Sequence, residues 1–451
     1  MRKQDSSRWI FIVFASFVFY GWWDWRFLFL IVSSGLVDYC AGLAMVKFDK
    51  RRRVILMLSL LANLGSLLVF KYSVFFAHIF EDLLLLMNIK VDLEGRIPEF
   101  ALILPVGISF YTFQSLSYTL DIYRKRLEPT RNILHFFSFL AMFPQLVAGP
   151  IIRAKDLLKQ LKTYRIPNDL EKWNAVKMIC YGLFQKVVIS DNLASVVDAA
   201  YEGKAMYADT GFWWFVAIAF SFQIYADFSG YSLIARGLAK LMGYHFRINF
   251  NHPYLATGLR QFWNRWHISL STWFRDYVYI PIGGSRNGVW VGALALIVTM
   301  VLSGIWHGAN YTFIVWALLH ATYLLAERHL KWTKRLKKFR LLLIFITFIQ
   351  VCVAWVYFRA DTIPQANDVI GSMFSLNFSN LGFTKTYFNE TVFLVLALVV
   401  EGLIYIRKQH SAWRRFYKKH QSPIDITMLA FSIICIIFLR GEGHQFIYFQ
   451  F

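Results

Sequence analysis

The sequence predicts an all-α protein that crosses a membrane several times. Of its 451 residues, 57% are hydrophobic and only 17% are charged. A soluble domain of this length could not bury so much apolar side chain. The apolar residues fall in runs, and roughly 20 residues are enough for a helix to span a bilayer. Short basic clusters separate these runs, which is typical of the cytoplasmic loops of membrane proteins.

The charge pattern also argues against nucleic-acid binding. The formal net charge is +21, but the basic residues are distributed over loops between apolar segments. The cysteines Cys40, Cys180, Cys352 and Cys435 each lie in an apolar run and show no CxxC spacing. We therefore interpret them as core or lipid-facing thiols, and not as disulfide partners or metal ligands.

Hydropathy and charge together predict the course of the chain. The apolar segments, in order, are residues 9–20, 27–46, 54–76, 176–199, 212–231, 289–306, 312–326, 341–358, 392–406 and 424–439. The first two form a predicted membrane hairpin with tryptophans at the interface, and no small-residue cleavage site marks a signal peptide. The loops expected in the cytoplasm are residues 47–53, 124–131, 153–177, 331–340 and 407–419, whereas 81–100 and 361–390 are expected outside.

Three further segments are too polar or too broken to cross lipid as simple helices. Residues 101–124 contain Pro105 and Gly107, followed by a row of hydroxyl and amide side chains. Because polar groups at membrane depth need partners, this segment should line the protein interior or a wet cavity. Residues 132–152 are flanked by basic loops on both sides and are predicted to be re-entrant. Residues 244–286, rich in Arg, Asn, His and aromatics, are predicted to form a helix along or dipping into one membrane face.

The candidate functional residues lie in two short sequence phrases, each built around a histidine. The first phrase is QFWNRWHISLSTWFRDY. Read as one helix, it places a polar stripe opposite an aromatic face. The stripe consists of Arg260, Asn264, His267 and Ser271, and the opposite face of Trp263, Trp266, Leu270 and Trp273. For His267, a cofactor contact, an interfacial anchor and catalysis all remain open.

The second phrase is SGIWHGAN, in which Ser303, His307 and Asn310 share a face with Tyr311. Gly304 and Gly308 form a small-xxx-small ridge where another helix could pack closely. An ionisable residue inside a membrane segment is costly, so His307 is a functional candidate by default. A buried neutral imidazole is suited to general-base chemistry. The competing interpretation is a structural histidine bonded to a backbone carbonyl.

The remaining candidates are weaker. Two histidines without a third ligand at a set spacing do not predict a zinc site. Asp227 could orient a histidine, or it could pair with one of the many arginines. The tryptophans are more often packing residues and interfacial anchors than parts of an active site, and the sequence contains no GxSxG, P-loop or dinucleotide fingerprint.

Nearly the whole chain resembles the membrane-bound O-acyltransferases of the bacterial alginate and peptidoglycan O-acetylation type. The matching phrases are LPVGISFYTFQSLSYTLDIYR (104–124), FPQLVAGPIIR (143–153), QIYADFSGYS (223–232), QFWNRWHISLSTWFRDYVYIPIGGSR (261–286), SGIWHGANYTFIVWALLH (303–320) and FIYFQF (446–451). The resemblance implies that His307 is the essential histidine and His267 the second one. It also implies a single integral-membrane domain over 1–451, with a core at about 54–330 and C-terminal helices at about 341–451. Its fold would be a ring of tilted and re-entrant helices around a central funnel with a narrow tunnel.

The activity implied by the resemblance is acyl transfer across the bacterial inner membrane. A cytoplasmic thioester donor, acetyl-CoA or another acyl thioester, would serve as a substrate, with no permanently bound cofactor. His307 would take the proton from the attacking hydroxyl, and Asn310, Trp306 or Asn264 would stabilise the oxyanion. Trp263, Ser303 and Asp227 are further candidates for lining the tunnel.

The implied acceptor is a serine of an exported SGNH-type partner, which then acetylates a polysaccharide. Alginate, peptidoglycan and another exopolysaccharide all remain open. The family's D-alanyl transferases share WNRWH and WHG, but the long tail after His307 favours the alginate and peptidoglycan type. A lipid acyltransferase and a non-catalytic acyl transporter also remain open. Family members commonly begin with one more apolar helix than this chain, which starts MRKQDSSRW, so the subgroup lacks that helix or the start codon is assigned late.

Overall fold

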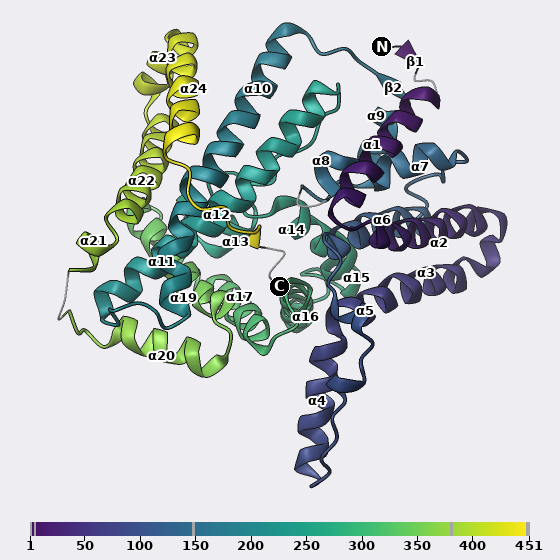
Figure 1. The fold of residues 1–451 in the computed structure, drawn as a ribbon, viewed down its shortest axis with the longest axis horizontal. Helices are drawn as coiled ribbons and strands as arrows, with labels where there is room; N and C mark the ends of the chain where they lie inside the picture. The colour runs from purple at the N-terminus through teal and green to yellow at the C-terminus, as the bar shows by residue number, and fades with distance from the viewer. Residues whose placement is uncertain (1, 4–5, 147–148, 379–381, 448–451) are drawn as a thin grey trace. The chain divides into compact units, whose positions relative to one another are not determined.

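The computed structural model describes residues 2–3, 6–146, 149–378 and 382–447. Helices dominate this part of the chain (Figure 1), which confirms the predicted all-α class. Two-residue strands, β1 (Arg2–Lys3) and β2 (Thr163–Tyr164), pair antiparallel. Six segments of the described chain are long and apolar enough to cross a membrane: Ser6–Lys47, Asp49–Leu86, Val289–His307, Arg340–Arg359, Phe388–Gln409 and Gln421–Phe438. The protein is thus a multi-pass membrane protein. The predicted segments 176–199, 212–231 and 312–326 are also largely helical, but they are not among these six.

The chain groups into two compact units. Unit 1 comprises Met1–Lys172 and Leu238–Phe246, and unit 2 comprises Trp173–Gly237 and Arg247–Phe451. The helices that begin before Lys172 are α1 (Ser6–Asp24), η1 (Trp25–Phe27), α2 (Leu28–Lys47), η2 (Asp49–Arg51), α3 (Arg52–Leu67), η3 (Leu68–Tyr72), α4 (Ser73–Leu86), η4 (Glu94–Arg96), α5 (Glu99–Leu102), α6 (Ile108–Tyr123), α7 (Ile133–Leu140), α8 (Phe143–Leu146), α9 (Ala154–Leu161) and α10 (Asp169–Leu183).

The third predicted span is longer than expected and is bent. Helices α3 and α4 are joined by the π-helical turn η3, and the helix direction changes there (Figure 1). Helix α4 continues to Leu86, beyond the predicted end at residue 76 and into the segment expected to be an external loop. A π-type insertion in a helix is a recognised cause of such a bend.

The polar segment α6 lies inside unit 1, as predicted. Nearly all of its residues are buried, and their side chains find partners within the protein. Asp38 of α2 accepts hydrogen bonds from Ser59, Asn63 and Ser115, and Gln114 donates to the backbone oxygen of Phe139. The predicted re-entrant segment 132–152 contains the short helices α7 and α8, and its residues 147–148 lie outside the described part of the chain.

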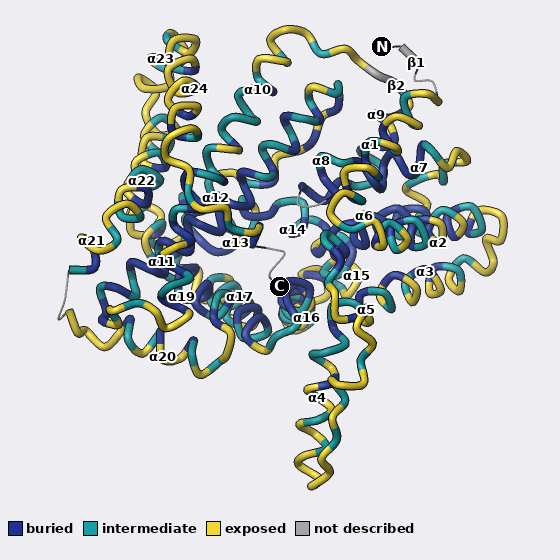
Figure 2. Tube along the Cα trace, viewed as in Figure 1, coloured by how far each residue is buried: buried dark blue, intermediate teal, exposed yellow. Residues whose placement is uncertain are grey.

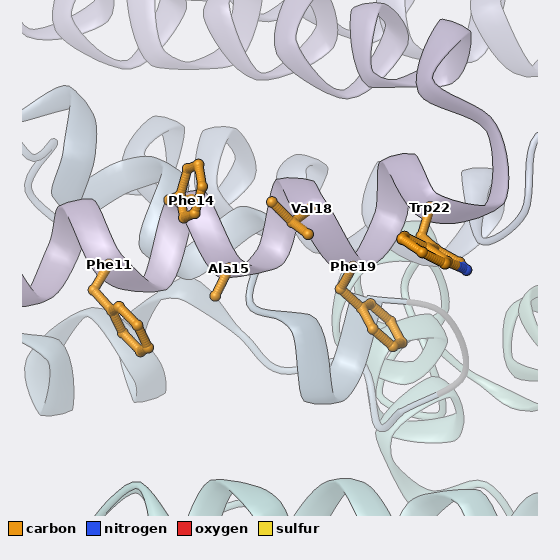
Figure 3. Close-up of a pocket in the computed structure, with 6 residues that line it drawn as sticks. All are labelled: Phe11, Phe14, Ala15, Val18, Phe19 and Trp22. Carbon is orange, nitrogen blue, oxygen red and sulfur yellow. The ribbon is translucent and has the colours of Figure 1, made fainter.

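Helix α1 carries an exposed apolar groove of about 540 Å³ (Figure 3). The groove is lined by Phe11, Phe14, Ala15, Val18, Phe19 and Trp22. Its aromatic side chains are half or more exposed, and Trp22 reaches 90% exposure. In a segment apolar enough to cross a membrane, such a face is suited to contact with hydrocarbon.

The helices of unit 2 hold both predicted histidine phrases. After the π-helix η5 (Phe184–Ser190) they are α11 (Asp191–Tyr201), α12 (Thr210–Leu241), η6 (Pro253–Leu255), α13 (Leu259–Trp263), α14 (Ile268–Phe274), η7 (Arg275–Tyr279), α15 (Ile280–Ile282), α16 (Val289–His307), α17 (Tyr311–Leu330), α18 (Trp332–Arg335), α19 (Arg340–Arg359), α20 (Ile363–Phe374), α21 (Phe383–Thr386), α22 (Phe388–Gln409), α23 (Ser411–Lys419) and α24 (Gln421–Phe438).

The core of unit 2 is aromatic. Helices α16, α17 and α19 pack in succession and carry many of its buried positions, whereas α22, α23 and α24 are largely exposed (Figure 2). Among the largest fully buried side chains are Trp266, Trp316, Trp355, Phe228 and Phe262. Phe228 contacts the His267 ring and Trp316 contacts the His307 ring, so the two histidines lie within this aromatic core.

Candidate functional site

The structure interrupts the first histidine phrase and does not form the single helix that was predicted. Helix α13 ends at Trp263 and α14 begins only at Ile268. His267 lies between them with φ 40° and ψ 55°, a left-handed backbone conformation that is uncommon for a residue other than glycine. The predicted continuous stripe through Asn264, His267 and Ser271 is therefore wrong.

The interruption arises because another segment supplies the hydrogen bonds that a helix would have used. The Ile268 amide donates to the backbone oxygen of Asn249 over 2.9 Å, and the Asn251 amide donates to that of Arg265 over 2.9 Å. The Asn249 side-chain oxygen also accepts from the Ser269 amide and hydroxyl. Strain at a residue held in this way is a common property of functional sites.

Asn249 also determines which His267 nitrogen carries the proton. Its Nδ2 donates to the Ser232 hydroxyl over 3.1 Å, so its Oδ1 faces the His267 Nδ1 at 3.3 Å. An amide oxygen can only accept, so Nδ1 donates and Nε2 holds the lone pair. His267 is fully buried, and burial lowers its pKa to about 3. The imidazole is therefore neutral at physiological pH, with Nε2 as the hydrogen-bond acceptor of the ring.

His307 is the last residue of α16, where the chain turns into α17. The turn is tight because Gly304 and Gly308 leave no room for a side chain. A Cβ at Gly304 would lie 2.5 Å from the Phe313 backbone oxygen, and one at Gly308 would overlap the Phe313 ring. This confirms that the two glycines form a close-packing ridge, and the helix against it is α17. His307 is buried, with the Trp316 and Phe358 rings at 5.1 and 5.3 Å.

Trp306 connects the two histidines. Its ring centroid lies 6.1 Å from that of His267 and 5.0 Å from that of His307. Phe228 of α12 covers the other side of His267 at 4.5 Å. Two imidazoles from phrases some 40 residues apart thus contact one indole in a buried aromatic environment. A buried pair of this kind is suited to proton transfer to or from a bound substrate.

Two of the candidate oxyanion donors, Asn310 and Asn264, are not buried. Asn310 caps α17, since its Oδ1 accepts from the Thr312 amide, and its Nδ2 donates to the Asp361 backbone oxygen over 2.8 Å. Asn264 ends α13 and is exposed. Ser303 is buried one turn before His307. Trp263 is half-buried, and its ring lies 5.9 Å from that of Trp316.

Asp227 is held by a lysine and by the C-terminal tail. Its Oδ1 lies 2.9 Å from the Lys186 ammonium, which also lies 2.8 Å from Asp191. The Ile447 amide donates to Asp227 Oδ2, and Lys186 donates to the His444 backbone oxygen. The charged partner of Asp227 in the structure is this lysine, and not one of the arginines that the sequence suggested. Residues 448–451 of the closing phrase lie outside the described part of the chain.

The buried ion cluster of Lys186, Asp191 and Asp227 is connected to the histidine site through aromatic side chains. Phe446 packs on Phe228 at 5.6 Å and on Tyr231 at 4.4 Å, and Phe228 in turn contacts His267. Sequence reasoning missed Asn249 and Lys186. Lys186, an ionised residue inside an apolar run, was the one with a recognisable signal. Within the described residues no group of three or more His, Cys, Asp or Glu side chains is placed to hold a metal ion.

The chain is similar to a known protein family and to several known proteins. A family model described as "MBOAT, membrane-bound O-acyltransferase family" matches residues 123–362, which include both histidines. The chain is 37% identical over 408 residues to the "Probable alginate O-acetylase AlgI" of Azotobacter vinelandii, covering 88% of this chain and 80% of that protein. It is 34% identical over 401 residues to the "Peptidoglycan O-acetyltransferase" of Helicobacter pylori, covering 82% and 74%.

A more distant relative is the "Teichoic acid D-alanyltransferase" of Streptococcus thermophilus. It is 30% identical over 262 residues, which cover 55% of this chain and 62% of that protein. The family match spans more than half of the chain, and the relatives named for O-acetylation align over most of their own length. The chain therefore belongs to the membrane-bound O-acyltransferase family.

Proposed function

We propose that the protein transfers an acetyl group from a cytoplasmic thioester across the bacterial inner membrane for O-acetylation of a cell-surface polysaccharide. The observation that carries this proposal is the pair of buried imidazoles at Trp306, in a chain of the acyltransferase family. The names of the most similar relatives support alginate, peptidoglycan or a similar exopolysaccharide as the final acceptor. The donor would be acetyl-CoA or another acyl thioester.

Acyl transfer of this kind requires a general base and the carbonyl group of the thioester donor. An acceptor hydroxyl gives its proton to the His307 imidazole as its oxygen attacks the thioester carbonyl. The tetrahedral intermediate collapses with cleavage of the C–S bond, and the departing sulfur takes the proton from the imidazolium. The products are an oxygen ester and a thiol, so no further reactant is needed. His267, with Nδ1 fixed by Asn249, presents its Nε2 as a second hydrogen-bonding group.

The first acceptor in this proposal is a serine of an exported SGNH-type partner protein, which passes the acetyl group to the polysaccharide. A hydroxyl acceptor suits the site, because a neutral imidazole activates a hydroxyl without a metal ion. The competing activities within the family are D-alanyl transfer and acylation of a lipid.

The direct test is turnover of acetyl-CoA by the purified protein in nanodiscs, with and without the exported partner. We expect release of free thiol together with acetylation of the partner's serine, detected by mass spectrometry. A D-alanyl thioester as the donor and acylated lipid as the product distinguish the competing activities. Absence of thioester consumption under all of these conditions would overturn the proposal and favour a non-catalytic acyl transporter.

Asn249 provides a prediction about the second histidine. Asn249→Leu removes the oxygen that accepts from His267 Nδ1 and from Ser269. We expect kcat to fall about fivefold, because a hydrogen bond contributes ~1 kcal/mol and about 1.4 kcal/mol corresponds to a factor of ten in rate. Asn249→Asp keeps the accepting oxygen and should retain more activity than the leucine variant. Equal activity of wild type and both variants, at equal thermal stability, would show that the orientation of His267 is unimportant.

A further inference from the structure

One face of α17 carries a line of buried polar atoms. Thr312, Trp316 and His320 follow one another at four-residue steps, so they lie on the same side of the helix. All three side chains are 0% exposed. Among the residues that the structure describes, none provides a hydrogen-bond partner for Thr312 Oγ1, Trp316 Nε1 or either ring nitrogen of His320.

Trp263 of α13 adds a fourth member to this group. Its Nε1 is also buried without a hydrogen-bond partner in the described part of the chain. Its ring lies 5.1 Å from His320 and 5.9 Å from Trp316, and Trp316 lies 5.0 Å from His320. Trp316 also contacts His307 at 5.1 Å. We call Thr312, Trp316, His320 and Trp263 the α17 polar face; it begins beside the proposed base.

Polar atoms buried in this way destabilise a folded protein unless something binds them. Native proteins keep few such groups, and each one needs an explanation. The rings of the α17 polar face meet edge to face, with interplanar angles of 71–75°. An N–H over a ring face is only a weak substitute for a hydrogen bond. Retention of four such side chains beside one catalytic histidine therefore points to a bound substrate group.

We infer that the α17 polar face binds the amide groups of the pantetheine arm of the thioester donor. The inference rests on the proposed function, in which that donor is an acyl thioester. Indole nitrogens only donate, a hydroxyl can do both, and a neutral imidazole offers one donor and one acceptor. A secondary amide matches this set, because its carbonyl accepts and its N–H donates. An amide is also neutral, and no charged side chain of the described residues lies within hydrogen-bonding distance of these four polar groups.

The length of the polar face also fits. From Thr312 to His320 the helix rises roughly 12 Å, at about 1.5 Å per residue. An extended pantetheine arm presents two amides in series before the sulfur, so successive polar groups on the helix can meet successive amides. Coenzyme A and a carrier protein present the same arm, and the inference is therefore common to both donors.

The test combines three variants with donors of different length. Thr312→Val, Trp316→Phe and His320→Phe remove polar atoms while keeping volume or a ring. The donors are acetyl-CoA, S-acetyl-N-acetylcysteamine with one amide, and S-ethyl thioacetate with none. We expect kcat/KM for the two amide-bearing donors to fall about three- to tenfold for each hydrogen bond lost. Turnover of S-ethyl thioacetate should fall much less than that of the amide-bearing donors, and the melting temperatures should stay equal or rise.

Trp214→Phe is the matched control, because the Trp214 Nε1 already donates to the Met373 backbone oxygen over 2.9 Å. It should lower stability without changing the preference among donors. An equal fall for all three donors in the α17 variants would overturn the inference, since the effect would then act on the thioester or on His307. Unchanged turnover of every donor would also overturn it, by showing that the face is merely packed.

A binding measurement separates this inference from the proposed activity. Pantetheine carries both amides but no acyl group, so its binding does not require turnover. We expect it to stabilise the wild-type protein in nanodiscs, with a Kd that is about three- to tenfold weaker in His320→Phe. Binding by wild type without any acyl transfer would contradict the proposed function alone. Turnover of acetyl-CoA with the same pantetheine affinity in both proteins would contradict the inference alone.

Discussion

Replacement of His307 by alanine is expected to lower acetyl transfer by about 10²- to 10⁴-fold, the usual contribution of a positioned general base. The side chain lies between the Trp306, Trp316 and Phe358 rings, so no other titratable group among these neighbours can take over. Alanine is a good helix former at the last residue of α16, and the fold should be retained. The rate of thiol release from acetyl-CoA, measured in nanodiscs, checks the prediction.

Chemical rescue provides a control for this variant. Free imidazole can supply the missing base where His307 has been removed, so it should restore part of the rate in His307→Ala. It should not raise the rate of the wild-type protein, which already has the imidazole of His307. Retention of more than a third of the wild-type rate in the alanine variant would exclude His307 as the general base. Loss of rate together with a large fall in melting temperature would instead assign it a structural role.

The largest effect on stability is expected from Lys186→Met. Lys186 binds two carboxylates, Asp191 and Asp227, and all three side chains are at most 10% exposed. Removal of one partner from a buried ion pair costs about 3–5 kcal/mol, because the remaining charge is left without compensation. The loss also removes the hydrogen bond to the His444 backbone oxygen. Unfolding in detergent, followed by circular dichroism, measures the effect.

Two companion variants make this result interpretable. The triple variant Lys186→Met, Asp191→Asn, Asp227→Asn removes the charges together and should recover much of the stability. Lys204→Met breaks the exposed pair with Glu202 and should leave the unfolding transition unchanged. A Lys186→Met protein as stable as wild type would mean that the two carboxylates are protonated or solvated in the membrane.

Much of the site could be predicted from local pattern, because its signals lie in short stretches of sequence. His307 and the Gly304–Gly308 ridge lie within one short phrase, so spacing alone placed them together. The row of polar side chains in α6 implied burial, since hydroxyls and amides at membrane depth need partners. The basic loops marked the ends of α19, α22 and α24, because clusters of Lys and Arg interrupt the apolar runs there.

The features that were missed depend on residues distant in sequence. The helix at His267 breaks because Asn249, 18 residues earlier, supplies competing hydrogen bonds, and helical periodicity cannot register such a partner. The sequence led to no prediction for His320. Its contact with Trp263 of another helix appears only in the structure. The extension of α4 to Leu86 was missed because acidic residues there suggested a loop.

The tight packing of α16 on α17 has a consequence for selectivity. Gly304 and Gly308 hold the two helices together, and only Gly308, Ala309 and Asn310 separate them. The proposed base and the α17 polar face are thus built on one stiff hairpin, with His307 and Trp316 in ring contact. Such a hairpin fixes the distance between His307 and each polar group of α17, in steps of one helical turn. If the face binds the donor as proposed, the hairpin would register the reacting carbonyl by its distance from the amides, so that a donor with a longer or shorter arm would present its acyl group out of reach.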